Sequence, residues 1–166
     1  MRAARLREIT VTARRGDWST ASPANALVGV RVIWGGLLLG PVALLVVVVA
    51  VGHGSERDLG DLAMFLFGLE VAFLVVAAVV GGFARKQIYK RHWQADAITP
   101  RGYVLGNILL LTLLEAASLF GLVLTMLHGR LIPMVLPAMI AMGLHAVNFP
   151  TGGPMQPAPM RRRAEA

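Results

Sequence analysis

Residues 103–127 form an apolar run of 25 residues with one acidic side chain, Glu115, at its midpoint and no Lys, Arg or His. A helix rises about 1.5 Å per residue, so this run is long enough to cross a hydrocarbon core roughly 30 Å thick. A carboxylate at that depth is costly, and residues of this kind usually serve a function or pair tightly with another group. The run therefore predicts a membrane protein and makes Glu115 the first candidate for a functional residue.

The composition of the whole chain supports a membrane location. Of its 166 residues 56% are hydrophobic, whereas about 45–50% is usual in a soluble domain. The formal net charge of +7 would also fit a nucleic-acid-binding protein, but Arg and Lys stand beside apolar runs, as in cytoplasmic loops of membrane proteins. We therefore expect the lipid bilayer, and no nucleic acid, as a partner. The chain lacks cysteine, which excludes disulfides and thiolate sites.

Four apolar segments alternate with polar ones and predict an all-α, polytopic membrane protein with four transmembrane helices. The predicted spans are residues 26–51, 62–83, 103–127 and 131–149, which together form a four-helix domain over 26–149. Residues 1–25 and 150–166 are expected to be basic cytoplasmic tails, the second of them disordered because it is rich in Pro and Gly. The segment QIYKRHW at 87–93 is expected to prolong the second helix beyond the membrane.

Basic residues are distributed unequally between the two sides of this layout. The N-terminal tail, the 84–102 loop and the C-terminal tail hold most of the Arg and Lys, and the other two loops hold only Arg57 and Arg130. By the positive-inside rule, both termini and the 84–102 loop are predicted to be cytoplasmic. The expected location is the inner membrane of a bacterium, with the chain as a multi-pass protein.

The predicted spans bring several polar side chains to similar depths. Glu115 would lie roughly 19 Å, and His145 roughly 21 Å, below the same outer surface if both helices are regular. Thr112 and Ser118 stand three residues on either side of Glu115 and share its helix face. These four residues, extended by Glu70 of the second span, are the candidates for an ion-binding cluster.

Two interpretations of Glu115 remain open. In the first, the carboxyl takes up and releases a proton or binds a cation. In the second, it is a permanently neutral acid or a hydrogen-bonded partner that fixes helix packing, and the protein is an accessory or structural subunit of a larger membrane complex. Both interpretations of Glu115 are compatible with a homo-oligomer. No HExxH, GxSxG or Gly-rich phosphate motif occurs, so no catalytic residue, metal site or cofactor is predicted, and the protein is not expected to be an enzyme.

Two pairs of small residues are spaced four positions apart, namely Gly36 with Gly40 in the first span and Ala117 with Gly121 in the third. Small residues at this spacing allow two helices to approach closely in a membrane. We expect all four to be helix-packing positions.

The segment LEAASLFGLV at 114–123 resembles the carboxylate helix of the proteolipid (c) subunit of rotary ATP synthases. In that family a Glu in an E-A-x-x-[IL]-[FY]-G-L-V setting carries the translocated ion, so the resemblance implies that Glu115 is the ion carrier. The match is strong over these residues and weak over the 62–127 hairpin, because the 62–83 helix lacks the glycine ladder of the family and the 84–102 loop is longer. The layout is also similar to that of a group of short bacterial four-span membrane proteins whose third helix has the same LLEAxxLFGLV pattern.

Overall fold

The computed structural model describes residues 22–51 and 60–157. The elements in chain order are α2 (Pro23–Val51), α3 (Asp61–Arg91), β1 (Trp93–Gln94), β2 (Ala97–Ile98), α4 (Pro100–His128), α5 (Val135–Val147) and the 3₁₀ helix η1 (Gly153–Met155). Apart from the two short strands, the regular elements are helical, which confirms the predicted all-α class for the described part. The predicted tail over 1–25 lies almost wholly outside the described residues, as does the end of the C-terminal tail.

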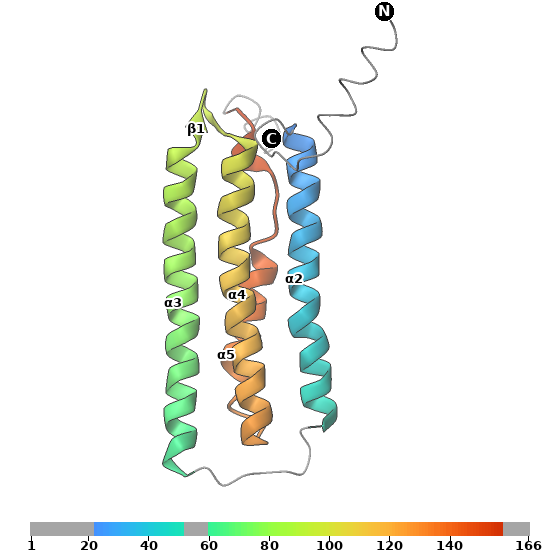
Figure 1. Cartoon of the computed structure of the whole chain (residues 1–166), viewed down its shortest axis with the longest axis vertical. Coiled ribbons are helices and arrows are strands. Elements are labelled where there is room, and N and C mark those ends of the chain that lie inside the picture. The colour runs from blue at the N-terminus through green and yellow to red at the C-terminus, as the bar shows by residue number, and fades with distance from the viewer. Residues whose placement is uncertain (1–21, 52–59, 158–166) are drawn as a thin grey trace, which may run out of the picture.

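Helix α4 is the centre of the molecule. It contacts α2, α3 and α5, and Figure 1 shows α2 and α3 on opposite sides of it with α5 behind. In the most apolar 18-residue window of each helix, 50% of α4 is buried, against 11% of α2 and 17% of α3. The apolar side chains of the two outer helices are therefore largely exposed, as in helices that face lipid.

Three helices, α2, α3 and α4, are long and apolar enough to cross a membrane by length and composition. Helix α3 continues to Arg91, so it includes most of the basic segment that was predicted to prolong it. Helix α5 has 13 residues, and its length of about 20 Å is less than a hydrocarbon core of about 30 Å. The predicted fourth span over 131–149 is therefore not one continuous helix.

Two prolines account for the shortness of α5. Pro133 precedes the helix and Pro137 lies in its first turn. Proline has no backbone N–H to donate, and it disfavours helical backbone in the residue before it. Residues 131–134 consequently form a turn, and regular helix begins only at Val135.

The chain beyond α5 returns along α2 and α4 to the end of the molecule that carries the hairpin. Arg31 Nε donates to the Pro150 carbonyl oxygen at 3.2 Å, and the Gly152 N–H donates to Tyr103 Oη at 3.0 Å. The composition predicted that residues 150–157 belong to a disordered tail. In the structure these residues include η1, and the two hydrogen bonds to their backbone hold them in place. Composition did not reveal these bonds because their donors and acceptors come from distant helices.

A β-hairpin joins α3 to α4. The two strands pair antiparallel, and both loop residues, Ala95 and Asp96, have positive φ values of 44° and 64°, as a two-residue type I′ turn requires. Thr99 then caps α4, because its side-chain oxygen accepts a hydrogen bond from the Gly102 N–H and Pro100 occupies the first turn. This short connection places α3 and α4 side by side and antiparallel.

Candidate functional site

The carboxyl group of Glu70 is the most deeply buried acidic group in the described part of the chain. Glu70 lies on α3 and is 1% exposed, and no described side chain bonds to its carboxyl oxygens. The Ala138 backbone N–H of α5 makes a weak polar contact with the carboxyl that falls short of regular hydrogen-bond geometry. An ionised carboxylate in such surroundings is strongly disfavoured unless another group neutralises it. Its proton or counter-ion must therefore come from outside the described set of side chains.

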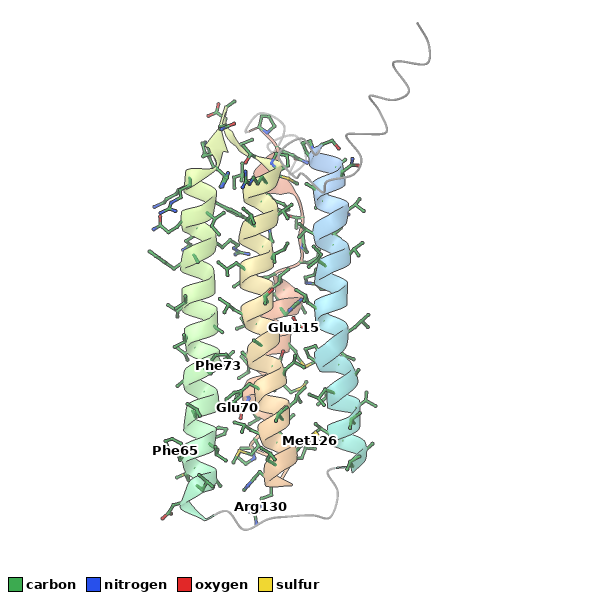
Figure 2. The ribbon with its side chains drawn as sticks, viewed as in Figure 1. Phe65, Glu70, Phe73, Glu115, Met126 and Arg130 are labelled. Carbon is green, nitrogen blue, oxygen red and sulfur yellow. The ribbon has the colours of Figure 1, made fainter. Side chains whose placement is uncertain are left out.

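A glycine on α4 makes the space for this carboxyl. A β-carbon on Gly121 would overlap Glu70 Oε1, and it would stand 2.9 Å from Glu70 Cδ and 3.0 Å from Ala138 Cβ. Figure 2 shows Glu70 between α3 and α4. Gly121 was predicted as a helix-packing position, and in the structure it allows α3, α4 and α5 to meet around the Glu70 carboxyl.

Two further buried polar residues, Thr125 and His128, follow Gly121 along the same face of α4. Thr125 Oγ1 donates to the Gly121 carbonyl oxygen at 2.8 Å, and His128 Nδ1 is buried without a hydrogen-bond partner. Neither residue was among the sequence-based candidates, although their four- and seven-residue spacing from Gly121 was a usable signal. We call Glu70, Gly121, Thr125 and His128 the Glu70 seam.

Glu115 lies elsewhere on α4 and faces α2. Its Oε1 is 3.5 Å from the position that a β-carbon on Gly40 would take, and its side chain is half-buried. The Ser118 hydroxyl is within bonding distance of the Leu114 and Glu115 carbonyl oxygens, at 3.0 and 2.9 Å. Thr112 is exposed. Ser118 therefore satisfies the backbone of its own helix and not the Glu115 carboxyl.

His145 pairs with the backbone of Trp34 on α2. Its Nε2 lies 3.2 Å from the Trp34 carbonyl oxygen, which can only accept, so Nε2 carries the hydrogen. In return, Trp34 Nε1 donates to the His145 carbonyl oxygen at 3.0 Å. This reciprocal pair fastens the end of α5 to α2 and gives His145 a structural role.

The contacts with α2 show that His145 and Glu115 lie at different depths. His145 bonds to Trp34, whereas Glu115 faces Gly40, and the rise of α2 between these two residues is about 9 Å. The prediction that Glu115 and His145 lie at the same depth assumed a regular helix from residue 131. The contacts with α2 instead place His145 closer to the hairpin end than Glu115.

The contacts of α4 separate Glu115 from Glu70 in the same way. Glu70 lies against Gly121, which is about 9 Å along α4 from Glu115. His128 lies about 10 Å beyond Gly121, at the far end of the helix. The titratable groups therefore occupy successive depths of the bundle.

The remaining predicted packing positions differ from each other. Ala117 is 3% exposed and packs with Leu74, Ala77 and Ala141 at the meeting of α3, α4 and α5. In contrast, a β-carbon on Gly36 would have no atom within 4 Å. Ala117 is therefore a helix contact within this chain, and Gly36 is open.

The site thus consists of two separate carboxyls, each opposed by a glycine. Within the described part, no hydrogen bond joins the side chains of any two of the five predicted ion-binding residues, Glu115, Glu70, Thr112, Ser118 and His145. Over residues 22–51 and 60–157 there is also no group of three or more His, Cys, Asp or Glu that could hold a metal ion. Comparison with protein-family models, curated proteins and solved structures finds no match for this chain.

Proposed function

We propose that this chain is a small integral membrane protein whose intramembrane carboxyls bind and release a proton or a monovalent cation. One observation carries the proposal: the Glu70 carboxyl is buried with no side-chain partner among the described residues and only a weak contact with the Ala138 backbone N–H, within a bundle whose long helices are apolar enough to cross a membrane. Buried polar groups are normally hydrogen-bonded, and an intramembrane acid is a functional group by default. Glu70 is the primary carrier in this proposal, and Glu115 is the second.

The surroundings of Glu70 favour a proton over a metal cation. A metal cation needs several oxygen ligands, whereas Glu70 lies against Gly121 and close to Ala138. A proton needs only titratable groups and hydroxyls at successive depths, as in the proton relays of membrane pumps. Thr125 and His128 provide such groups between Glu70 and the far end of α4.

The competing role is structural, with the carboxyls as polar packing groups and the protein as an accessory subunit. A packing role for Glu70 requires a hydrogen-bond partner that the carboxyl holds in place. The described residues give it only the weak contact with the Ala138 backbone N–H, and this favours the ion-binding role.

We further propose that the protein lies in the inner membrane of a bacterium with both tails in the cytoplasm. The exposed basic residues Lys86, Lys90 and Arg91 gather at the end of α3 that carries the hairpin, and positive charge marks the cytoplasmic side of membrane proteins. The segment after α5 reaches Tyr103 at this same end. Helix α5 and that segment would together make a fourth crossing.

Reporter fusions along the chain test this topology. A fusion at Gly129 should read periplasmic, and fusions at Trp93 and Pro157 should read cytoplasmic, because the basic residues hold the hairpin end inside. A cytoplasmic reading at Gly129 would exclude the arrangement. A periplasmic reading at Pro157 would leave three crossings and place the last part of the chain outside.

Proton and sodium flux into vesicles that contain the purified protein tests the function. Glu70→Gln keeps the shape of the side chain and removes its titration, so it should abolish the protein-dependent flux. Asp96→Asn is the matched control, because it makes the same change from acid to amide in the exposed hairpin and should leave the flux intact. Wild-type flux no greater than that of empty vesicles would contradict ion transfer.

A further inference from the structure

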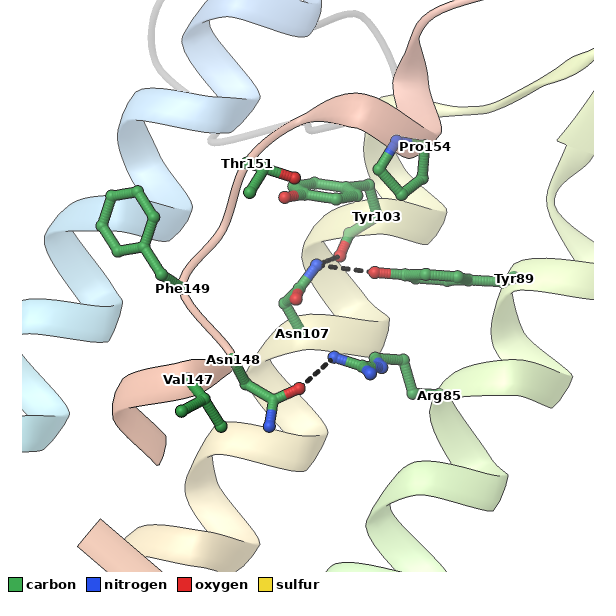
Figure 3. A pocket seen from close by; sticks show the side chains of 9 residues that line it. All are labelled: Arg85, Tyr89, Tyr103, Asn107, Val147, Asn148, Phe149, Thr151 and Pro154. Carbon is green, nitrogen blue, oxygen red and sulfur yellow. Dashed lines mark hydrogen bonds between the residues drawn. The ribbon is translucent and has the colours of Figure 1, made fainter. Parts of the chain in front are cut away.

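A second polar site lies at the hairpin end of the molecule, about 22 Å along α3 from Glu70. It is a cavity of about 190 Å³ between α3, α4 and the segment that follows α5 (Figure 3). A single enclosed water needs only about 10–15 Å³, so a larger group fits. The polar side chains of its wall are Arg85, Tyr89, Tyr103, Asn107, Asn148 and Thr151.

Arg85 supplies a positive charge to this cavity. Its Nη1 donates to Asn148 Oδ1 at 2.9 Å, and Asn148 Nδ2 in turn donates to the Leu144 carbonyl oxygen. A guanidinium group has five N–H donors, so this one bond leaves donors available. None of the acidic residues in the described part of the chain lines the cavity; they are Asp61, Glu70, Asp96 and Glu115.

The tyrosine hydroxyls of the wall have protons to donate. Tyr89 Oη accepts a hydrogen bond from Asn107 Nδ2 at 2.8 Å, and Tyr103 Oη accepts one from the Gly152 N–H at 3.0 Å. A hydroxyl that already accepts a bond still has its own proton to donate. Thr151 adds a third hydroxyl. The wall therefore combines a guanidinium with hydroxyl donors and contains no carboxylate.

We propose that this cavity, the Arg85 cavity, binds a phosphate group. The free oxygens of a phosphate accept hydrogen bonds, which matches a wall of this kind, and arginine suits phosphate because it can make two parallel bonds to it. The site goes beyond the ion-binding proposal and does not depend on it.

The surroundings of the cavity make a phospholipid one source of that phosphate. Near Arg85, α3 passes from exposed apolar residues, Val80 and Phe83, to the exposed basic residues Lys86 and Lys90. A headgroup could enter the cavity while its acyl chains lie along the apolar part of α3, as anionic lipids do beside basic segments. Inorganic phosphate offers the same chemistry without the chains.

Thermal unfolding of the full chain in a neutral detergent distinguishes the two sources. The three additives are short-chain phosphatidylglycerol, the diacylglycerol with the same chains and no phosphate, and inorganic phosphate. Phosphatidylglycerol should raise the unfolding midpoint as its concentration rises, and diacylglycerol should not. If inorganic phosphate raises the unfolding midpoint equally, the ligand is a soluble phosphate. If inorganic phosphate leaves the midpoint unchanged, the ligand is the lipid. No shift with either phosphate, or an equal shift with diacylglycerol, would overturn the proposal.

Variants test whether Arg85 makes the contact. Arg85→Gln should weaken phosphatidylglycerol binding about tenfold or more, because it removes charge-assisted hydrogen bonds. Arg101→Gln is the matched control, since it makes the same substitution at an exposed position of α4, at the same end of the molecule and outside the cavity wall. Tyr89→Phe removes one hydroxyl donor, should also weaken binding, and provides the test if Arg85→Gln fails to fold. Equal losses in Arg85→Gln and Arg101→Gln, or unchanged binding in Tyr89→Phe, would overturn the proposal.

Discussion

Replacing Glu70 with methionine is expected to stabilise the folded protein by about 1–3 kcal/mol, the usual cost of a buried polar group without a hydrogen-bond partner. Methionine keeps the length of the unbranched side chain and removes both carboxyl oxygens, neither of which has a hydrogen-bond partner of regular geometry among the described residues. Glu70→Gln leaves polar atoms in place and should change stability far less. The free energy of unfolding, measured by reversible denaturation in mixed micelles, checks both values.

Glu115→Met is the matched control for that measurement. Glu115 is the other carboxyl within the apolar stretches, but its side chain is only half-buried. A partly exposed group meets lipid in both the folded and the unfolded state, so its loss should change the free energy of unfolding by at most about 0.5 kcal/mol. A clear loss of stability in Glu70→Met would show that the carboxyl holds α3 against its neighbours, and it would support the packing role.

Replacing Gly121 with leucine is expected to destabilise the protein by about 1–3 kcal/mol or more, as overpacking of a filled contact does. Even a β-carbon at this position overlaps Glu70 Oε1 and stands 3.0 Å from Ala138 Cβ, so leucine must push α3 and α5 away from α4. Unfolding in mixed micelles measures the loss.

Gly68→Leu is the control for the change at Gly121, because a β-carbon on Gly68 would have no atom within 4 Å. It should cost no stability, since leucine favours a helix more than glycine does. A double-mutant cycle then isolates the contact: Gly121→Ala should cost less in a Glu70→Ala background than in the wild type. Equal losses for the two leucine variants, or strictly additive effects in the cycle, would argue against the contact between Glu70 and Gly121.

The long helices could be predicted from the sequence because hydropathy and length define them directly. The continuation of α3 to Arg91 also followed from the sequence, because residues 84–91 contain neither proline nor glycine and include the good helix formers Ala, Arg, Lys and Gln. The short α5 did not follow, because a hydropathy count gives Pro133 and Pro137 little weight although they delay the start of the helix. A fixed rise per residue then placed His145 at the wrong depth.

The candidate site was predicted less well than the helices, because depth along a helix can be read from a sequence and direction around it cannot when the helix is apolar on all sides. Glu115 was given priority for its mid-span position, but it is half-buried beside Gly40. Glu70 is the residue whose carboxyl is enclosed. The spacing of Gly121 predicted a close helix contact, and in the structure Gly121 lies against the Glu70 carboxyl. That carboxyl comes from a helix whose rotation the sequence did not show.

Labelling of Glu70 by a carbodiimide in native membranes, with the labelled residue identified by mass spectrometry, tests the ion-binding proposal most directly. Such a reagent attacks a protonated carboxyl in an apolar environment, and a carboxyl that exchanges its proton should lose reactivity as the pH rises. We predict strong labelling of Glu70 at acid pH and a progressive decrease toward alkaline pH, with protection by sodium if a cation binds in place of the proton. Labelling that stays the same at every pH and in every salt would show a permanently neutral acid and would contradict the proposal.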